Sequence, residues 1–197
     1  MSTIAVFGSA SRISETTPER PQTYYGSSKL KADKELVAMN DREFKAAIIR
    51  PPMAYGGGMA PGNMLRLIRL VNKHIPLPFG SARNSRDFIN VKNLVEFIHL
   101  AVEKEVEGVF YPTDKVPYST RNVVEEISRQ LGVHTINLPS PSIFLKLIEK
   151  VRPDLYQKLW GDVVIDRQLA LSAIGYEPRY TLEDGIREMV ESFKRQK

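Results

Sequence analysis

Short apolar runs that are typical of strands alternate with longer amphipathic runs that are typical of helices along most of this chain. The strand-like runs are rich in apolar and β-branched residues and span residues 3–8, 44–51, 86–91 and 108–114. The helix-like runs span residues 25–40, 62–74, 94–104, 119–132 and 182–197. No tight Asn-Gly hairpin joins two of the strand runs. The alternation therefore predicts an α/β fold with a largely parallel sheet.

Several of these segments carry residues that mark their ends. The expected markers are Pro51 and Pro52 after the second strand, Asn93 as the N-cap of the helix at 94–104, and Ser119 and Gly132 at the two ends of the helix at 119–132. From about residue 108 onward helices dominate, and only short extended pieces are expected near Ile136 and Val164. The second half of the chain is therefore predicted to form a smaller, mainly helical lobe.

The composition excludes several classes of function. The chain has no cysteine, so disulfides and thiolate metal sites are impossible and a reducing cytoplasm is the expected location. The three histidines lie far apart, so no metal site is expected. The net charge is +5, but acidic residues are interleaved with the basic ones, so no nucleic-acid partner is expected. No apolar run approaches the roughly 20 residues of a bilayer span, and the opening residues lack the basic leader of a signal peptide, so no membrane partner is expected.

Tyr25 and Lys29 form the most suggestive chemical pair, because they stand four residues apart near the start of a predicted helix. Side chains at this spacing lie on one helical face a turn apart, and a nearby ammonium favours the phenolate form of a tyrosine. Such a tyrosine can act as a general acid or base. The spacing alone is weak, since Tyr111 and Lys115 share it, but Pro112 and the preceding strand pattern argue against a helix there.

Six stretches, in order, resemble the extended short-chain dehydrogenases/reductases, in the branch of NAD-dependent, nucleotide-sugar epimerases and dehydratases. They are "STIAVFG", "YYGSSKLKADKEL", "IIRPPMAYGGG", "PGNMLRLIRLV", "SRDFINVKNLVEFIHLAVE" and "LALSAIGYEPRYTLEDGIREMVESF". The resemblance implies a Rossmann-like parallel sheet with a small, mostly helical substrate lobe. On this basis residues 1–107 are assigned to the back half of the dinucleotide-binding domain, and residues 108–197 mainly to the substrate-binding lobe.

The resemblance also implies a catalytic triad of Thr3, Tyr25 and Lys29. Tyr25 would be the general acid/base toward a sugar hydroxyl or keto group, while hydride moves to or from a nicotinamide. Lys29 would favour the Tyr25 phenolate and hydrogen-bond the nicotinamide ribose. Thr3 takes the hydroxyl role when the stretch is aligned on its aromatic-Gly end, and Ser2 is the alternative; otherwise Thr3 is an ordinary strand threonine.

Further residues are implied as binding contacts. Pro51 and Pro52 would lie against the nicotinamide, a role compatible with stopping a strand. Asn63 would lie near the nucleotide diphosphate of the substrate, the alternative being helix capping. Arg86 would bind the substrate pyrophosphate, the alternative being a surface arginine paired with its neighbour Asp87. Met53 departs from the asparagine that many sugar-nucleotide members carry, which leaves that substrate contact open.

The Gly-rich turn that binds the dinucleotide pyrophosphate in this family does not occur in these 197 residues. The "GGG" at 56–58 belongs to a later loop and is no substitute. By family comparison, roughly the first hundred residues, one βαβαβ half, are expected to be missing. We therefore expect weak NAD or NADP binding and little turnover by this chain alone. The sheet edge left exposed would favour self-association, so a homo-oligomer is expected.

Three functional hypotheses remain open at this stage. The first is a nucleotide-sugar epimerase, dehydratase or 4-reductase, present as a fragment. The second is a non-catalytic relic or binding subunit of the same fold. The third is a reductase of the same superfamily acting on a sterol or another non-nucleotide alcohol, for which Met53 gives room and against which Asn63 and Arg86 count.

Overall fold

The computed structural model describes residues 1–58, 62–171 and 174–196, and the contacts within it divide the chain into two compact units. Unit 1 contains residues 1–54, 87–116 and 163–179, and unit 2 contains residues 55–86, 117–162 and 180–197. The chain therefore passes from one unit to the other several times. The functional assignment of residues 1–107 and 108–197 stays a prediction.

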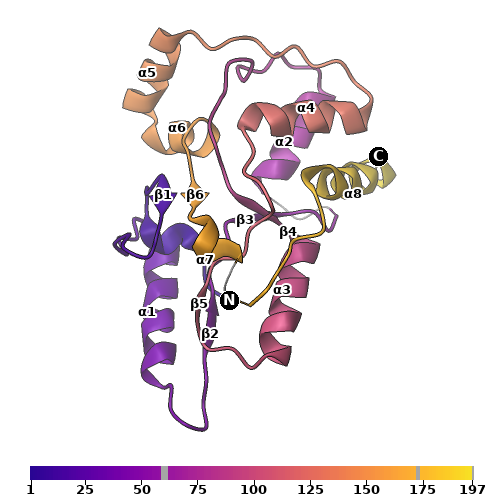
Figure 1. Cartoon of the computed structure of the whole chain (residues 1–197). Helices are drawn as coiled ribbons and strands as arrows, with labels where there is room; N and C mark the ends of the chain where they lie inside the picture. Colours follow the sequence, from indigo (N-terminus) through magenta and orange to yellow (C-terminus); the bar gives the residue numbers. More distant parts are fainter. Residues whose placement is uncertain (59–61, 172–173, 197) are drawn as a thin grey trace. The chain divides into compact units, whose positions relative to one another are not determined.

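Unit 1 combines parallel strands with two long helices. Its elements are the 3-10 helix η1 (Ile4–Phe7), β1 (Arg12–Ile13), α1 (Tyr24–Ala38), β2 (Ala47–Ile49), β4 (Phe88–Asn90), α3 (Val91–Glu103), β5 (Gly108–Phe110), β6 (Val164–Ile165) and α7 (Arg167–Leu171). Strand β2 pairs in parallel with β5, and β1 pairs in parallel with β6. Helices α1 and α3 lie on either side of the β2–β5 pair (Figure 1). The predicted α/β fold with parallel strands is confirmed.

Two apolar clusters hold unit 1 together. The first packs α3 against β2 and β5 through Phe97, Ile49 and Phe110, with Tyr176 edge-on to Phe97 at a centroid distance of 5.1 Å. The second joins η1 and α1 to the β1–β6 pair through Val6, Phe7, Ile13, Leu30 and Ile165. Burial of these side chains is the main force that fixes α1 next to η1.

The strand predicted at residues 3–8 is wrong, because Ile4–Phe7 forms a single 3-10 turn. The Thr3 side chain accepts a hydrogen bond from the Ala5 N–H, which caps the turn. Gly8 ends it with φ of 63°, a left-handed conformation that favours glycine. A Cβ on Gly8 would also lie 2.3 Å from the Arg20 carbonyl oxygen. An apolar run of four residues fits a buried turn as well as a strand, and these two ends decide between them.

Asn93 was predicted as a helix cap, and this prediction is also wrong. Helix α3 begins three residues earlier than predicted, at Val91, and its N-cap Asn90 accepts from the Lys92 N–H. Asn93 is fully buried, its amide donates to Asp114 at 2.7 Å, and its side-chain oxygen accepts from the Arg179 N–H at 3.0 Å. Asn93 therefore links α3 to two distant segments of unit 1 rather than starting a helix.

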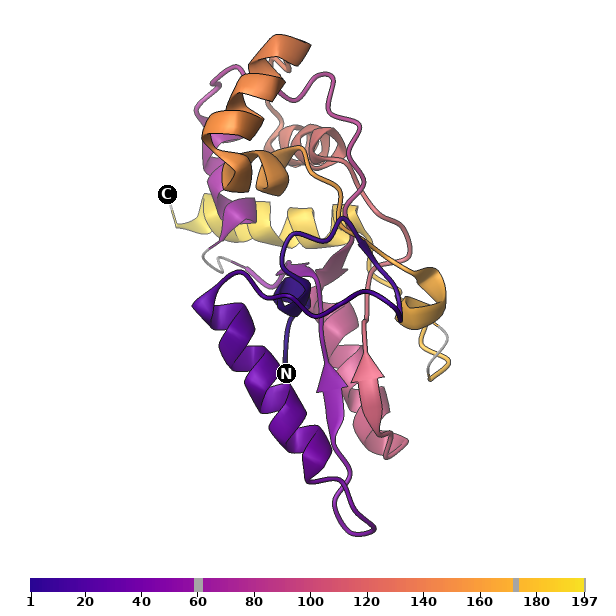
Figure 2. The ribbon, with the colours of Figure 1, turned by 90° about the vertical axis from the view of Figure 1, so that its left-hand side faces the viewer.

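Unit 2 is mainly helical. Its helices are α2 (Asn63–Asn72), α4 (Thr120–Leu131), α5 (Ser142–Val151), α6 (Pro153–Leu159) and α8 (Leu182–Arg195), and β3 (Met53–Tyr55) runs across the boundary from unit 1. Helix α4 packs against both α2 and α8, and α5 and α6 are adjacent (Figure 2). The core of this bundle contains Ile68, Ile127 and Ile186, all fully buried.

The predicted ends of α4 are confirmed. Ser119 and Asn122 form a reciprocal capping box, and Gly132 ends the helix in the left-handed conformation with φ of 72°. The extended piece near Val164 is β6, and Leu77 bridges Asn137 next to Ile136. The predicted C-terminal helix is α8, although Lys197 lies outside the described residues. Within the described ranges, no helix is long and apolar enough to cross a membrane.

Candidate functional site

Helix α1 brings Tyr25 and Lys29 onto one face in unit 1. Thr23 caps the helix by accepting from the Gly26 N–H at 3.0 Å, so Tyr25 lies in the first turn. The Lys29 ammonium lies 6.0 Å from the centroid of the Tyr25 ring. It also donates to the Met1 carbonyl oxygen at 3.2 Å. The Tyr25 side chain is exposed, so its phenol is accessible to a ligand.

The other tyrosine at this spacing has a different role. Tyr111 follows β5 in a non-helical segment, as the sequence predicted, and its hydroxyl accepts from the Arg50 guanidinium at 3.3 Å. Burial raises the pKa of Tyr111, although Arg50 acts in the opposite direction. Tyr111 is therefore half-buried and packs against an apolar cluster of unit 1, whereas Tyr25 faces solvent.

Thr3 and Ser2 differ in how their hydroxyls are used. The Ser2 hydroxyl is buried and donates to the Asp33 carboxylate at 2.7 Å, so it is committed to the core. The Thr3 hydroxyl oxygen caps η1 at 3.2 Å from the Ala5 nitrogen, and Thr3 is half-buried. Of the two hydroxyls, that of Thr3 is the one left near the surface, at the start of the turn that packs against α1.

Gly26 permits the close approach of α1 to η1. A Cβ at position 26 would lie 2.7 Å from the Ala5 carbonyl oxygen and 3.1 Å from the Pro21 Cβ. The first distance is shorter than real contacts allow, and its partner is backbone, which cannot rotate away. The glycine directly after Tyr25 therefore determines how close Tyr25 comes to the turn that follows Thr3.

We expect Gly26→Ala to lower the free energy of unfolding by about 1–2 kcal/mol, because an overpacking cost of about 2–3 kcal/mol against rigid backbone outweighs the gain in helix propensity of about 1 kcal/mol. Urea denaturation followed by circular dichroism measures this. Ser27→Ala, at the next, exposed position of α1, is the matched control and should cost no stability. A Gly26→Ala protein as stable as the wild type would show that Gly26 is not required for the close packing of α1 against η1.

A buried ionic cluster joins the segments that carry these residues, and the sequence analysis missed it. Arg50 donates to Asp33 at 2.9 Å and to Glu19 at 2.6 Å, with only 5% of its side chain exposed. Burial disfavours its charge, but the two carboxylates outweigh burial, so the pKa of Arg50 lies above its usual value. Asp33 lies one turn beyond Lys29, and Ser2, which also contacts Asp33, precedes Thr3. The cluster thus fixes α1, β2 and the residues before η1 to one another.

Pro51 and Pro52 directly follow Arg50, at the end of β2. Both are buried, and the Pro51 carbonyl oxygen accepts from the Ile4 N–H at 3.3 Å. The predicted strand stop is confirmed, since β2 ends at Ile49. Their contact with a nicotinamide stays a prediction.

In unit 2, Asn63 is the first residue of α2 and does not cap it. Gly62 occupies the N-cap position and there is no side-chain cap, so the alternative role weighed for Asn63 is wrong. Asn63 instead lines a cavity of about 410 Å³ together with residues from α5 and α6. The lining residues are Asn63, Arg66, Val151, Arg152, Pro153, Leu155, Lys158 and Leu159.

This cavity is cationic. Arg66, Arg152 and Lys158 all line it. Three cations around a space of this size favour an anion with several oxygens, such as a diphosphate. Sequence reasoning found Asn63 but missed the three cations, because α2 and the α5–α6 segment are far apart along the chain and no local pattern connects them.

Arg86, which is half-buried, contacts the backbone of the same part of unit 2. One guanidinium nitrogen donates to the carbonyl oxygens of Gln157 at 2.7 Å and Gly161 at 2.8 Å. Burial lowers the pKa of Arg86, although the nearby Asp162 charge acts in the opposite direction. The two carbonyls flank Lys158, so Arg86 holds the segment that carries a cation of the cavity.

The surface pair with Asp87, the alternative weighed for Arg86, is wrong. Asp87 is buried, and its carboxylate accepts hydrogen bonds from the Arg167 guanidinium at 2.5 Å and from the Ile165 N–H at 2.7 Å. Burial raises the pKa of Asp87, although both hydrogen bonds favour its charged form. Because Asp87 already has these partners, the acid next to Arg86 in the sequence belongs to a different part of the structure.

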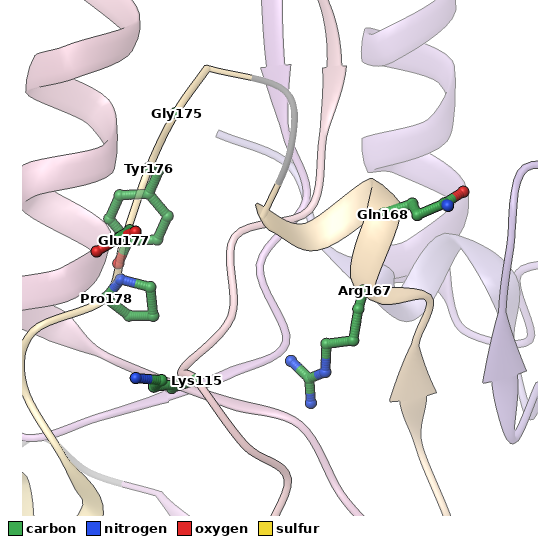
Figure 3. A pocket seen from close by; sticks show the side chains of 7 residues that line it. All are labelled: Lys115, Arg167, Gln168, Gly175, Tyr176, Glu177 and Pro178. Atoms are coloured by element: carbon green, nitrogen blue, oxygen red, sulfur yellow. The ribbon is translucent and has the colours of Figure 1, made fainter.

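A second cavity, of about 480 Å³, lies in unit 1 and contains none of the residues predicted from the sequence. Figure 3 shows the Arg167 side chain extending toward this space, with Tyr176, Glu177 and Pro178 on its opposite side. The Arg167 guanidinium also donates to the Thr113 hydroxyl at 2.8 Å. The Arg167 guanidinium therefore contacts both Asp87 and Thr113. Through these contacts it connects the start of α7, just after β6, to the segment that follows β5. Over the described part of the chain, no group of three or more His, Asp or Glu side chains could hold a metal ion.

Comparisons with known proteins identify the family and the fold of this chain. Residues 1–111 match the model of the NAD dependent epimerase/dehydratase family. The UDP-glucose 4-epimerase of Vibrio cholerae is 35% identical over 179 residues, which are 88% of this chain and 54% of that protein. The chain thus spans about half the length of the curated relative that it matches.

Solved structures show the same fold. The UDP-glucuronic acid 4-epimerase of Bacillus cereus, in complex with NAD, superposes with a TM-score of 0.75 at 21% identity, covering 98% of this chain and 60% of that one. The dTDP-glucose 4,6-dehydratase of Bacillus anthracis str. Ames, also with NAD, gives a TM-score of 0.71 at 21% identity, covering 100% of this chain and 61% of that one.

Proposed function

Because the chain belongs to the NAD-dependent epimerase/dehydratase family, we propose that its residues carry out proton transfer on a nucleotide sugar and bind its diphosphate. The observation that carries this proposal is the Tyr25–Lys29 pair, with the ammonium 6.0 Å from the ring centroid on an accessible face of α1. Among epimerase, dehydratase and reductase activity, the names of the relatives favour the epimerase, because two of these relatives are 4-epimerases by name.

In this proposal Tyr25 removes the proton of a sugar hydroxyl while the carbon that carries this hydroxyl is oxidised. Tyr25 returns the proton when the resulting keto group is reduced. Lys29 places a positive charge 6.0 Å from the centroid of the phenol ring. The Thr3 hydroxyl orients the sugar oxygen by a hydrogen bond. The nicotinamide, when bound, supplies the acceptor and donor of hydride.

The residues present fit the nicotinamide end of NAD better than its pyrophosphate end. Tyr25 and Lys29 offer an accessible hydroxyl and ammonium, and the end of β2 at Pro51–Pro52 is fixed by its bond to Ile4. No Gly-rich turn is present in the 197 residues to receive the pyrophosphate. The missing contacts would be worth several kcal/mol, at about 1.4 kcal/mol for each tenfold in affinity, so this chain alone binds NAD weakly.

The nucleotide diphosphate is held in unit 2 in this proposal. Asn63 supplies an amide, and Arg66, Arg152 and Lys158 supply positive charge around the cavity of about 410 Å³. Arg86, which the sequence suggested as a pyrophosphate ligand, acts mainly by fixing the carbonyls on either side of Lys158. The complexes of relatives with UDP-glucuronic acid and UDP-glucose support this class of substrate.

The second candidate function is a nucleotide-sugar-binding subunit without turnover. It is favoured by the absence of a Gly-rich turn from the sequence, since the binding cavity of unit 2 does not depend on that turn. Under either function we propose a homo-oligomer. Exposed apolar side chains on α1 and just after it, Leu36, Val37 and Met39, support self-association through this helix.

Hydride transfer distinguishes the two functions. We would join a Gly-rich dinucleotide-binding half from a relative in front of this chain, saturate the chimeric protein with NAD, and add UDP-glucose. The enzymatic proposal predicts a transient rise in NADH absorbance as the sugar is oxidised. A chimera that binds both ligands but gives no NADH would favour the binding subunit.

A further inference from the structure

Helix α5 presents a row of large apolar side chains to solvent. Ile143, Leu147 and Val151 are 80%, 60% and 64% exposed, and they follow one another at intervals of four residues on one helical face. Phe144, beside this row, is 40% exposed, and no residue of α5 is buried. A contiguous exposed apolar surface of this kind is uncommon on a monomeric protein and marks a binding surface.

The row leads directly into the cationic cavity of unit 2. Val151, its last member on α5, lines that cavity, and so does Leu155 on α6, which is itself 45% exposed. From Ile143 to Val151 the row is about 12 Å long at the rise of an α-helix. The apolar row and the cavity therefore form one continuous surface, with its charges at one end.

The charges specify the chemistry of an occupant. The cavity carries Arg66, Arg152 and Lys158, while Lys146 and Lys150 lie beside the apolar row on α5. An occupant that matches this surface has an anionic head with several oxygens and a flexible apolar body. A nucleoside diphosphate also supplies an anionic head, but its hydroxyls and polar base do not cover a row of aliphatic side chains.

We propose that unit 2 binds a diphosphate ester with a long hydrocarbon substituent. Its diphosphate occupies the cationic cavity, and its hydrocarbon chain lies along Ile143, Leu147 and Val151. The inference rests on the proposed function, because it uses the same cavity, and it adds hydrocarbon-linked diphosphates to the nucleotide-linked ones that this cavity is proposed to bind. Burial of the chain along the row supplies affinity that the phosphate contacts alone do not.

Calorimetric titration of the 197-residue chain with farnesyl diphosphate and with inorganic diphosphate tests this. We expect farnesyl diphosphate to bind about tenfold more tightly or better, since only it covers the apolar row. Leu147→Ser should remove that difference and leave the affinity for inorganic diphosphate unchanged. Lys158→Ala should weaken both ligands. Val102→Ser on α3, where the valine is 71% exposed, is the matched control and should change neither.

Equal affinities of the wild type for the two diphosphates would overturn the proposal. If UDP-glucose still binds in that case, and Lys158→Ala weakens it, the proposed function stands without the hydrocarbon substrate. If neither UDP-glucose nor any diphosphate binds, both the hydrocarbon-diphosphate proposal and the proposed function are wrong. The proposal is also overturned if Leu147→Ser abolishes self-association in sedimentation experiments, or abolishes binding to phosphatidylglycerol vesicles, while the affinity for farnesyl diphosphate stays unchanged.

Discussion

Replacing Arg50 by methionine is expected to lower the free energy of unfolding by about 3–5 kcal/mol, the largest stability effect that we predict for a single substitution. The guanidinium is the partner of two carboxylates, and the side chains of Arg50 and Asp33 are only 5% and 6% exposed. Without it, the Asp33 carboxylate remains buried with the Ser2 hydroxyl as its nearest remaining donor. An uncompensated charge in the interior costs more than the hydrogen bonds that are lost.

Urea denaturation of the wild type and Arg50→Met measures this effect. Arg187→Met is the matched control, because Arg187 pairs with Asp184 at a site where its side chain is 46% exposed, and exposed pairs contribute about 1 kcal/mol or less. Adding Asp33→Asn to Arg50→Met should restore part of the stability, since it removes the orphaned charge. A loss below about 1 kcal/mol in Arg50→Met would mean that the cluster does not hold unit 1 together.

Replacing Tyr25 by phenylalanine is expected to lower turnover of UDP-glucose by a factor of about 10² to 10⁴, in the chimeric protein that carries a Gly-rich half. Phenylalanine keeps the ring against Lys29 but has no proton to exchange with the sugar hydroxyl. The affinity for UDP-glucose should change little, because the proposed diphosphate ligands are in unit 2. The rate at which NADH first appears after saturating UDP-glucose is added, before the keto intermediate is reduced again, measures the effect.

Tyr24→Phe provides the matched control for this substitution. Tyr24 precedes Tyr25 on α1 and is 98% exposed, so its hydroxyl has no proposed part in the chemistry. We expect the Tyr24→Phe chimera to turn over UDP-glucose at the rate of the parent. Equal rates for Tyr25→Phe and the parent would remove Tyr25 from the mechanism.

The elements that the sequence predicted correctly are those whose signals are local. Ser119 and Gly132 mark the ends of α4 by their own backbone preferences, and Pro51 ends β2 because it lacks an N–H. The 3-10 turn at Ile4–Phe7 also had local signals in Thr3 and Gly8, but the apolar run between them is compatible with a strand as well. A run of only four residues is too short for its hydrophobic periodicity to distinguish a 3-10 turn from a strand.

The rest depends on contacts between distant parts of the chain. Asn93 is a good N-cap residue by type, and only its bonds to Asp114 and Arg179 show that it belongs to the interior. Arg50 gives no sign in the sequence of its distant partners Glu19 and Asp33. The cationic cavity likewise joins α2 to the α5–α6 segment. Such groupings follow from packing, which a single sequence does not encode in any local pattern.

Calorimetric titration of the 197-residue chain with UDP-glucose and, separately, with NAD measures which of the two ligands this chain binds by itself. We expect UDP-glucose to saturate a single site, Lys158→Ala to weaken its binding by about tenfold through the loss of a charged phosphate contact, and NAD not to saturate at millimolar concentration. NAD binding in the micromolar range, with no binding of UDP-glucose, would be the opposite result and would refute the proposed diphosphate site.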